Sequence, residues 1–440
     1  MEKMKKISNI EDSFDLSLND MRRIIRGFHS EMKKGLAGKK SSLRMIPTYV
    51  DRPVGNEKGR FIALDLGGTN FRVLELELKG HGRCSAPKVK KFVIDKAHMS
   101  GSARDLFGFI ARCIKSSMKD MNIVSLQGLK LGFTFSFPVE QDGVASGRLL
   151  RWTKGFKVKG VKGKDVVRLL ENALALNGIM NIEVSALAND TVGTMAAMAY
   201  QDKRCDVGVI LGTGTNACYR EDLLEVPKWK GQGTPSGYMI INTEWGSFNI
   251  LKTTKYDIEL DKRSWNCGHQ IMEKMVSGMY LGEVARLVLK DLIRKGLIFD
   301  GMSSPAFDTA CNFRTEYMSR VEGDTSIALT GVSRLLNQLG IKRPSLDDRK
   351  LVKKICKIVG LRAARVSAAA IAAVVTKMDP ALSRNHTVAI DGSVYEKYPG
   401  FARNIKAALL ELFGKRSSRI KLRLAKDGSG KGAAIIAAVA

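Results

Sequence analysis

Two glycine-rich turns, each following an apolar stretch, contain the residue types that bind phosphate groups. Residues 65–70 read DLGGTN and residues 212–217 read GTGTNA. Glycines let the backbone approach phosphate oxygens closely, hydroxyl and amide groups donate hydrogen bonds to them, and the Asp65 carboxylate is able to bind Mg²⁺ or its water. Arg72 adds a fixed positive charge just beyond the first turn. Taken alone, a Gly-Gly turn is more often a simple hairpin connection, because glycine is the default turn residue.

The second turn also matches the G-x-G-x-x-G/A pattern of dinucleotide-binding proteins. Two features argue against that interpretation. The following residues lead into the charged pair Glu221-Asp222 and not into an apolar helix, and threonine hydroxyls suit β- and γ-phosphates better than a pyrophosphate bridge. Residues 428–432 (GSGKG) resemble a Walker loop, but Gly432 stands where Ser or Thr must hold Mg²⁺. The sequence therefore supports neither of these two nucleotide motifs.

A further set of polar residues at strand ends and helix starts has the chemistry of a site for a polyhydroxy ligand. Carboxylates and amides pair with neighbouring hydroxyls, and functional residues concentrate in such loops. The set comprises Ser136, Thr153, Lys154, Asn189, Asp190, Asn216, Asn242, Glu244 and Glu273. With the glycine turns, these residues make phosphoryl transfer to a sugar-like alcohol one of several open hypotheses. Asp190 is also compatible with a helix cap, and Glu273 with an ordinary exposed helix position.

The hydrophobic pattern predicts the elements that carry these residues. Apolar stretches predict strands at 60–66, 71–78, 129–137, 182–187, 207–211, 387–390 and 421–424, and helical spacing predicts helices at 15–34, 161–176, 191–200 and 270–294. The first two strands are expected to pair as an antiparallel hairpin. One strand followed by a glycine turn in each half indicates a duplicated α/β architecture with a phosphate-binding turn on each side.

Length and composition restrict the class of protein. The chain has 440 residues, of which 44% are hydrophobic and 26% are charged, as in globular proteins of two to three domains. Seven scattered Cys and five scattered His argue against a zinc site or disulfide framework and for a cytosolic enzyme. The most apolar stretch, 361–378, contains two arginines and predicts a buried helix and no membrane span. The N-terminal residues MEKMKK are not followed by an apolar run, so we expect no signal peptide and a cytoplasmic location.

The formal net charge of +28 would attract polyanions. The Lys and Arg residues are spread along the chain, however, and do not interleave with aromatic residues as in nucleic-acid-binding modules. We therefore expect a solvated basic surface, nonspecific polyanion binding at low salt, and no specific nucleic-acid partner.

The motifs, taken in chain order, resemble those of the hexokinase family. Eight segments carry the resemblance: 64–72, 131–138 with 152–156, 188–193, 211–216, 242–246, 273–278, 389–395 and 427–433. The resemblance implies an α/β fold of the two-lobed actin-like ATPase (ribonuclease H-like) type, in which a small and a large domain close over a cleft. The small domain would comprise 56–188 plus 426–440, and the large domain 1–55 plus 189–425.

The resemblance also implies an activity and a role for each matching residue. The activity is ATP-dependent phosphorylation of the 6-hydroxyl of glucose and related hexoses, with Asp190 as general base and Lys154 as a second catalytic residue. The hexose-binding residues would be Ser136, Thr153, Lys154, Asn189, Asp190, Asn216, Glu244 and Glu273. The residues that bind Mg·ATP would be Asp65, Gly67, Gly68, Thr69, Asn70, Arg72, Thr213, Gly214, Thr215, Gly392 and Ser393, with Asp65 holding Mg²⁺ through water.

Two other functions stay open, a catalytically weak sugar-sensing regulator on the same fold and a polyanion-binding protein. The sequence leaves the preferred hexose, product inhibition and the oligomeric state open. It also departs from the family pattern at Lys426, where relatives carry an acidic residue, and in the lysine-rich segments 227–237 and 250–256. Residues 76–102 match only loosely, and Lys91 is the candidate there for a nucleotide-binding lysine. These departures concern nucleotide affinity and regulation, not the reaction.

Overall fold

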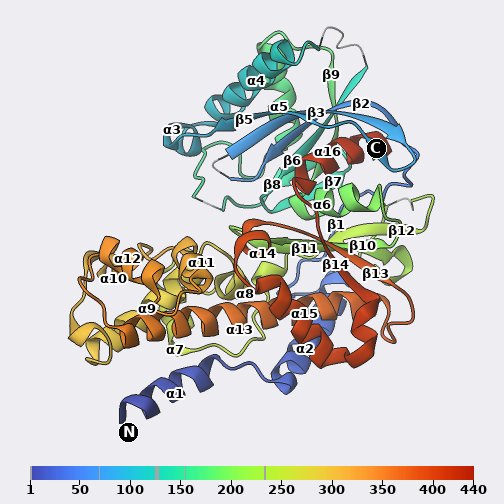
Figure 1. Ribbon diagram of the computed structural model, residues 1–440. Coiled ribbons are helices and arrows are strands. Elements are labelled where there is room, and N and C mark those ends of the chain that lie inside the picture. The colour runs from blue at the N-terminus through green and yellow to red at the C-terminus, as the bar shows by residue number, and fades with distance from the viewer. Residues whose placement is uncertain (1, 69, 124–127, 154, 232–233) are drawn as a thin grey trace.

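The computed structural model describes residues 2–68, 70–123, 128–153, 155–231 and 234–440. They form two lobes, each built on a six-stranded sheet, with the smaller lobe at the top of Figure 1 and the larger lobe below it. The predicted mixed α/β class is confirmed. Helices cover the faces of both sheets, and the functional segments lie where the lobes meet.

The small-lobe sheet has the order β4-β3-β2-β6-β9, and β5 also pairs with β3. Its strands are β2 (Lys58–Leu66), β3 (Asn70–Gly80), β4 (Arg83–Cys84), β5 (Lys88–Val93), β6 (Leu129–Phe135) and β9 (Ile182–Ala188). β2 and β3 form the predicted antiparallel hairpin, and their register places Asp65 opposite Arg72. Alternate β2 side chains enter different cores: Ile62 and Leu64 pack with helices α4 (Ala103–Asp120) and α5 (Val166–Leu176), whereas Ala63 packs on the other face.

The large-lobe sheet has the order β1-β12-β11-β10-β13-β14. Its strands are β1 (Ile46–Pro47), β10 (Cys205–Leu211), β11 (Thr215–Asp222), β12 (Tyr238–Asn242), β13 (His386–Asp391) and β14 (Ile420–Leu424). β10 and β11 form an antiparallel hairpin around the second glycine turn, as β2 and β3 do around the first. The predicted strand followed by a glycine turn in each half is therefore confirmed, and the returning strand β11 of the second half is an element that the sequence did not predict.

Two helices lie between the sheets. α6 (Asp190–Ala199) packs on the large-lobe sheet, α16 (Gly428–Val439) packs on the small-lobe sheet, and the two helices contact each other. Glycines make this contact close. A Cβ atom at Gly432 would lie 1.8 Å from the carbonyl oxygen of Gly193, and one at Gly132 would lie 1.9 Å from that of Ala433. A larger residue at Gly432 would push α16 away from α6, and one at Gly132 would push α16 away from β6 of its own lobe.

The other face of the large-lobe sheet is covered by a helical layer. Its longest members are α2 (Leu18–Leu36), α13 (Leu346–Met378), α15 (Phe401–Phe413) and α9 (Leu281–Arg294). The remaining elements are α1 (Glu2–Phe14), α3 (Lys96–Ser100), α7 (Lys255–Arg263), α8 (Ile271–Val276), α10 (Pro305–Asp308), α11 (Thr315–Gly323), α12 (Thr330–Gln338), α14 (Ser393–Lys397), the hairpin β7 (Val139–Gly143) and β8 (Ser146–Leu149), and the short 3₁₀ turns η1 (Leu223–Glu225), η2 (Trp245–Ser247), η3 (Phe299–Gly301) and η4 (Gly414–Arg419).

The predicted continuous helix over 270–294 is wrong, because the chain leaves the helix between α8 and α9. There the backbone N–H of Gly278 donates to the carbonyl of Gly212 at 2.8 Å, and the N–H of Met279 donates to that of Thr213 at 3.2 Å. A continuous helix would use both N–H groups internally. The break therefore anchors α8 to the second glycine turn, which periodicity cannot reveal.

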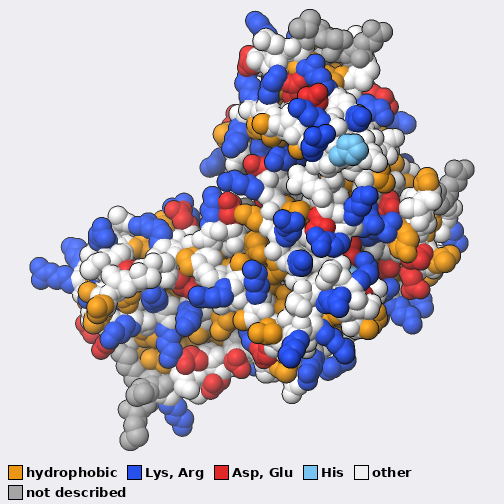
Figure 2. Space-filling view, turned by 45° about the vertical axis from the view of Figure 1, so that its right-hand side comes forward, with side chains coloured by type: hydrophobic (Ala, Val, Ile, Leu, Met, Phe, Trp, Pro, Cys, Tyr) orange, Lys and Arg blue, Asp and Glu red, His pale blue; other side chains and the backbone are white. Residues whose placement is uncertain are grey.

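Helix α13 contains the apolar stretch 361–378. Within the described residues it is long and apolar enough to cross a membrane by length and composition, but 83% of its most apolar window is buried in the protein. The prediction of a buried helix is confirmed. Figure 2 shows Lys and Arg side chains scattered over the visible face of both lobes with Asp and Glu among them, as expected for a solvated basic surface.

Candidate active site

A cavity between the lobes brings together the polar residues that the sequence predicts to bind a sugar. Its lining includes Ser136, Thr153, Asn189, Asp190, Asn216, Glu244 and Glu273, whereas Asn242, the remaining described member of the polar set, does not line it. Lys154 lies outside the described residues. The small-lobe members lie after β6 and near β8, and the large-lobe members lie at the ends of strands and the starts of helices. Chain segments more than 130 residues apart in sequence therefore converge on one cavity.

Amide and carboxylate groups on the large-lobe side form a connected network. The Asn216 side-chain amide donates to Asn242 Oδ1 at 2.9 Å, to Glu244 Oε1 at 3.0 Å and to Asn189 Oδ1 at 3.3 Å. Asn242 Nδ2 also donates to Glu244 Oε1 at 3.0 Å. Burial raises the pKa of Glu244, and the Asn242 hydrogen bond partly offsets this effect. The network fixes the side chains before a ligand arrives.

Backbone geometry aims two residues of the cavity wall. Glu244 adopts a left-handed conformation with φ 54°, and Gln270, which precedes α8, adopts one with φ 56°. Non-glycine residues rarely occupy this region, and such strain concentrates at functional sites. Glu273 on α8 accepts a hydrogen bond from the backbone N–H of Thr215 at 3.1 Å. It is therefore held against the second glycine turn and is not the ordinary exposed helix residue that was one interpretation of its sequence position.

Asp190 is the first residue of α6, and Asn189 is the residue that caps this helix. The Asn189 side chain accepts from the backbone N–H of Thr191 at 3.1 Å and from the Thr191 hydroxyl at 2.8 Å. Asp190 Oδ1 accepts a further hydrogen bond from the same N–H at 2.9 Å. Because Asn189 supplies the cap, a capping role alone does not account for Asp190.

A second cavity of about 510 Å³ adjoins the first and is lined by both glycine turns. Its lining includes the following residues predicted to bind nucleotide: Asp65, Gly67, Asn70, Arg72, Thr213, Gly214, Gly392 and Ser393. Thr69 lies outside the described residues, and Gly68 and Thr215 do not line this cavity. Thr215 lines the first cavity, where its hydroxyl donates to the Ile210 carbonyl at 3.0 Å and accepts from Trp245 Nε1 at 2.9 Å.

Asp65 and Arg72 belong to an ion-pair network that joins β2 and β3, the strands on either side of the first glycine turn, to the start of the C-terminal helix α16. Arg72 Nε donates to Asp65 Oδ2 at 3.0 Å, and Arg72 Nη1 donates to Asp427 Oδ1 at 2.5 Å. The Ser429 hydroxyl donates to Asp65 Oδ2 at 2.9 Å. Among the described residues, Arg72 and Ser429 both donate to Oδ2 of Asp65, which leaves Oδ1 on the other side of the carboxylate.

Sequence reasoning missed Asp391 as a lining residue of the second cavity. Its carboxylate accepts from the backbone N–H of Gly392 at 2.7 Å and from that of Gly428, the first residue of α16, at 3.1 Å. Burial raises the pKa of Asp391 to about 6 although both hydrogen bonds oppose the shift. Its position at the end of a predicted strand, directly before Gly392, was the available signal. Lys91, the predicted nucleotide-binding lysine, also lines this cavity.

The lobes, the paired glycine turns and the two adjoining cavities define a two-lobed α/β protein of the actin-like ATPase fold, with a cavity lined by amides and carboxylates beside a cavity lined by both glycine turns. Profiles of the hexokinase family match residues 6–200 and 206–439. The chain belongs to the hexokinase family, whose enzymes phosphorylate hexoses.

Individual relatives agree with this assignment. The chain is 44% identical to Hexokinase-7 of Oryza sativa subsp. japonica over 93% of this chain and 91% of the rice protein. It is 40% identical to Hexokinase HKDC1 of Homo sapiens over 99% of this chain but spans only 48% of that longer protein. The solved structure of a Schistosoma mansoni hexokinase complexed with glucose superimposes with a TM-score of 0.91 at 37% identity, covering 100% of this chain and 99% of the other. The expected two-lobed fold is therefore confirmed.

Proposed function

We propose that the protein transfers the γ-phosphoryl group of ATP to the 6-hydroxyl of glucose or a related hexose, with Asp190 as the general base. The observation that carries the proposal is that Asp190 lines both cavities, the one with the sugar-type residues and the one with the glycine turns. A general base must lie within hydrogen-bond reach of the attacking hydroxyl, and that hydroxyl must face the phosphate. The glucose bound to the Schistosoma relative supports a hexose as acceptor.

The chain's own residues have separate tasks in this proposal. Asn189, Asn216, Glu244 and Glu273 would bind ring hydroxyls from the large lobe, and Ser136, Thr153 and Lys154 would bind them from the small lobe. Asp190 would accept the proton of the 6-hydroxyl as that oxygen attacks phosphorus, which typically contributes about 10²–10⁴-fold in rate. Enclosure between the lobes would exclude water, which otherwise competes as phosphoryl acceptor. Lys154 as a second catalytic residue stays a prediction from the resemblance.

The residues present fit Mg²⁺ bound mainly through phosphates. The described residues contain no cluster of three or more metal-ligating side chains. Mg²⁺ commonly keeps several waters and takes one or two carboxylates together with substrate phosphates. Asp65 Oδ1, free of the Arg72 and Ser429 hydrogen bonds, would hold a water of such an ion. The ion would neutralise charge on the transferred phosphoryl group.

The test is a coupled assay of hexose 6-phosphate formation from glucose and Mg·ATP. Asp190→Asn keeps the size of the side chain but removes the base, so we expect kcat to fall by about 10²-fold or more while glucose binding by calorimetry persists. The matched control is Asp347→Asn, because the Asp347 side chain is 89% exposed on α13. The control should retain wild-type turnover. Full activity in Asp190→Asn would contradict its assignment as the base.

The alternative of a sugar-sensing regulator makes a different prediction in the same experiment. A regulator would bind glucose by calorimetry in the wild-type protein and form no hexose 6-phosphate. The connected amide and carboxylate network is compatible with both functions, since it only binds hydroxyls. The base and the paired phosphate turns are the features that favour the enzyme.

A further inference from the structure

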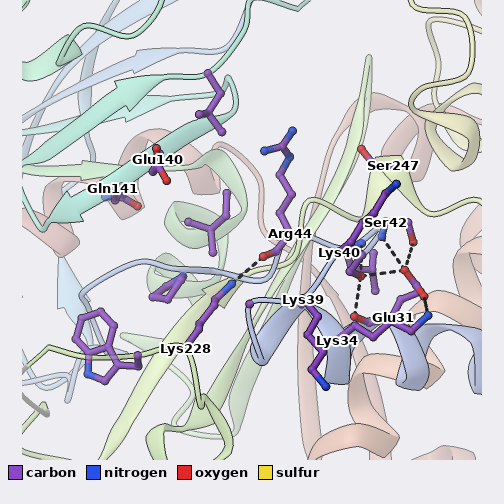
Figure 3. A pocket seen from close by; sticks show the side chains of 18 of the residues that line it. Glu31, Lys34, Lys39, Lys40, Ser42, Arg44, Glu140, Gln141, Lys228 and Ser247 are labelled. Carbon is purple, nitrogen blue, oxygen red and sulfur yellow. Dashed lines mark hydrogen bonds and ion pairs between the residues drawn. The ribbon is translucent and has the colours of Figure 1, made fainter.

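A third cavity, of about 1160 Å³, opens beside the first cavity, which we call the sugar cavity. None of its described lining residues belongs to the two glycine turns. It is walled by the end of α2 and residues 38–49, by the loop 228–231, and by residues 140–141 and 150–151. The first two walls belong to the large lobe and the third to the small lobe. In Figure 3, Arg44 extends between the strand that carries Glu140 and Gln141 and the segment that carries Ser247. The volume of this cavity is comparable to that of small-molecule binding sites, which is about 300–1,000 Å³.

The cavity is strongly basic. Glu31 and Lys34 cancel each other: they pair at 2.6 Å, and although burial opposes the shift, hydrogen bonds from Lys34, Ser41 and Ser42 lower the pKa of Glu31 to about 2. The other acidic lining residue is Glu140. Against it stand Lys39, Lys40, Arg44, Arg151, Lys228 and Lys230, none of which forms an ion pair within the described part of the chain. Such a concentration of positive charge attracts multiply charged anions.

Donor groups in the wall are buried and lack acceptors. Trp229 Nε1 and Arg151 Nε are both shielded from solvent and have no hydrogen-bond partner among the residues that the structure describes. Burial also lowers the pKa of Lys228 to about 8, while its ammonium donates to the Arg44 carbonyl at 2.9 Å. Unsatisfied buried donors are rare because each one costs free energy. Because these two atoms are shielded from the open cavity as well as from bulk solvent, an anion would reach them only if the Arg151 and Trp229 side chains turn toward it. An anion beside Lys228 would favour the charged form of that side chain directly.

Two residues connect this cavity to the sugar cavity, because Arg151 and Gln270 line both. Arg151 Nη2 donates to Gln270 Oε1 at 3.1 Å, and Gln270 Nε2 donates to Glu273 Oε1 at 3.4 Å. Arg151 belongs to the small-lobe wall, whereas Gln270 and Glu273 belong to the large lobe. An anion that draws Arg151 toward Arg44 and Lys228 would therefore change a contact between the lobes and the hydrogen bonding of Glu273.

We propose that this cavity is an effector site for a small anion carrying two or more phosphate groups, and that its occupancy changes the affinity of the neighbouring site for hexose. The second part rests on the proposed function, and the first does not. A single phosphate leaves most of the positive charge uncompensated, which favours several phosphate groups. Condensed phosphates and sugar bisphosphates share this chemistry. The lysines of the loop 227–237, which the family pattern does not account for, form part of the site.

Binding is tested by calorimetry on the full chain with two probes, tripolyphosphate for condensed phosphates and fructose 1,6-bisphosphate for sugar bisphosphates. A saturating non-hydrolysable ATP analogue blocks the nucleotide cavity. We expect one site with Kd below about 100 µM for at least one probe, and at least tenfold weaker binding in the double variant Lys228→Gln/Lys230→Gln. The matched control is Lys406→Gln/Lys415→Gln, which removes two exposed lysines of α15 and η4 with no ion pair in the described residues.

Indole fluorescence gives a second readout that is specific to the cavity. Probe binding should change the emission of the wild-type protein, and Trp229→Phe should abolish most of that change. Equal losses in the two double variants would mean nonspecific polyanion binding and would overturn the proposal, as would no binding at 1 mM of either probe.

The coupling is tested by titrating glucose with and without the bound probe. We expect a shift of threefold or more in glucose Kd, with the reciprocal shift in probe Kd that linkage requires. Probe binding in a protein without kinase activity would leave the anion site standing and refute only the proposed function. Kinase activity without probe binding would refute the anion site and leave the proposed function standing. Probe binding that leaves glucose Kd unchanged would overturn the effector role.

Discussion

The contact between Glu273 and the second glycine turn allows a test of how precisely the sugar cavity is built. A Cβ atom at Gly214 would lie 2.8 Å from Glu273 Oε2, closer than any ordinary contact. The carboxylate is the end of a flexible side chain, so it would move aside and the fold would survive. We therefore expect Gly214→Ala to displace Glu273 from Thr215 without unfolding the protein.

The expected size follows from the hydrogen bond that is lost. The Thr215 N–H donates to the Glu273 carboxylate at 3.1 Å, and hydrogen bonds to charged groups contribute about 1.5–3 kcal/mol. If that free energy is lost from sugar binding, KM for glucose should rise roughly 10- to 150-fold. The midpoint of denaturant unfolding should remain close to that of the wild type.

One glycine from each of the two glycine turns, Gly68 and Gly212, supplies a control for this prediction. A Cβ atom at Gly68 would have no neighbour within 4 Å, and one at Gly212 would lie 3.4 Å from Gly392. Neither Gly68→Ala nor Gly212→Ala should change KM for glucose by more than about twofold, and Gly212→Ala should act on KM for ATP. In the Glu273→Asp variant the side chain is one methylene shorter and leaves room for a methyl group at position 214. Adding Gly214→Ala to that variant should therefore raise KM for glucose by a smaller factor than adding it to the wild type. A Gly214→Ala enzyme with wild-type KM for glucose would refute the reasoning.

Three further predictions concern stability. The raised pKa of Asp391, about 6, means that the folded protein binds its proton more tightly than the unfolded chain, so the stability from this group falls as pH rises from about 4 to 6. Asp391→Asn should reduce that slope in denaturant melts across this range. His386 lies buried between two aspartates at 2.8 and 3.2 Å; His386→Leu removes both hydrogen bonds and should cost about 1–3 kcal/mol, whereas the exposed His269→Leu should cost little. Gly432→Ala places a Cβ atom 1.8 Å from a carbonyl oxygen of α6 and should cost about 3 kcal/mol or more, unlike the surface substitution Gly108→Ala.

The sequence predicted the elements that have strong local signals. The hairpin β2-β3 was predictable because its apolar residues alternate around a Gly-Gly turn. The break between α8 and α9 was not, because residues 271–294 have the apolar spacing of one helix and the reason for the break lies in the carbonyls of a distant turn. Local periodicity contains no information about such long-range hydrogen bonds.

The residues expected to bind the hexose were predictable as a set, but their arrangement in space was not. Asn216 and Glu244 stood out by residue type, yet the hydrogen bonds that connect them depend on the pairing of β11 with β12. The basic cavity was less predictable still. Lysine enrichment in 227–237 was visible, whereas the buried Arg151 and Trp229 donors became relevant only when loops of both lobes met.

The contact between α6 and α16 explains why motion of the lobes and chemistry are connected in this fold. α6 packs on the large-lobe sheet and begins with Asp190, whereas α16 packs on the small-lobe sheet and begins beside Ser429, which binds Asp65. Where these helices meet, Gly193 and Gly432 have no side chains, so the two backbones lie in direct contact. Packed helices with small interface residues can slide over each other without repacking large side chains. A closure of the cleft would therefore move Asp190 relative to Asp65, and under the proposed function the motion that encloses the hexose would also move the proposed base relative to the first glycine turn.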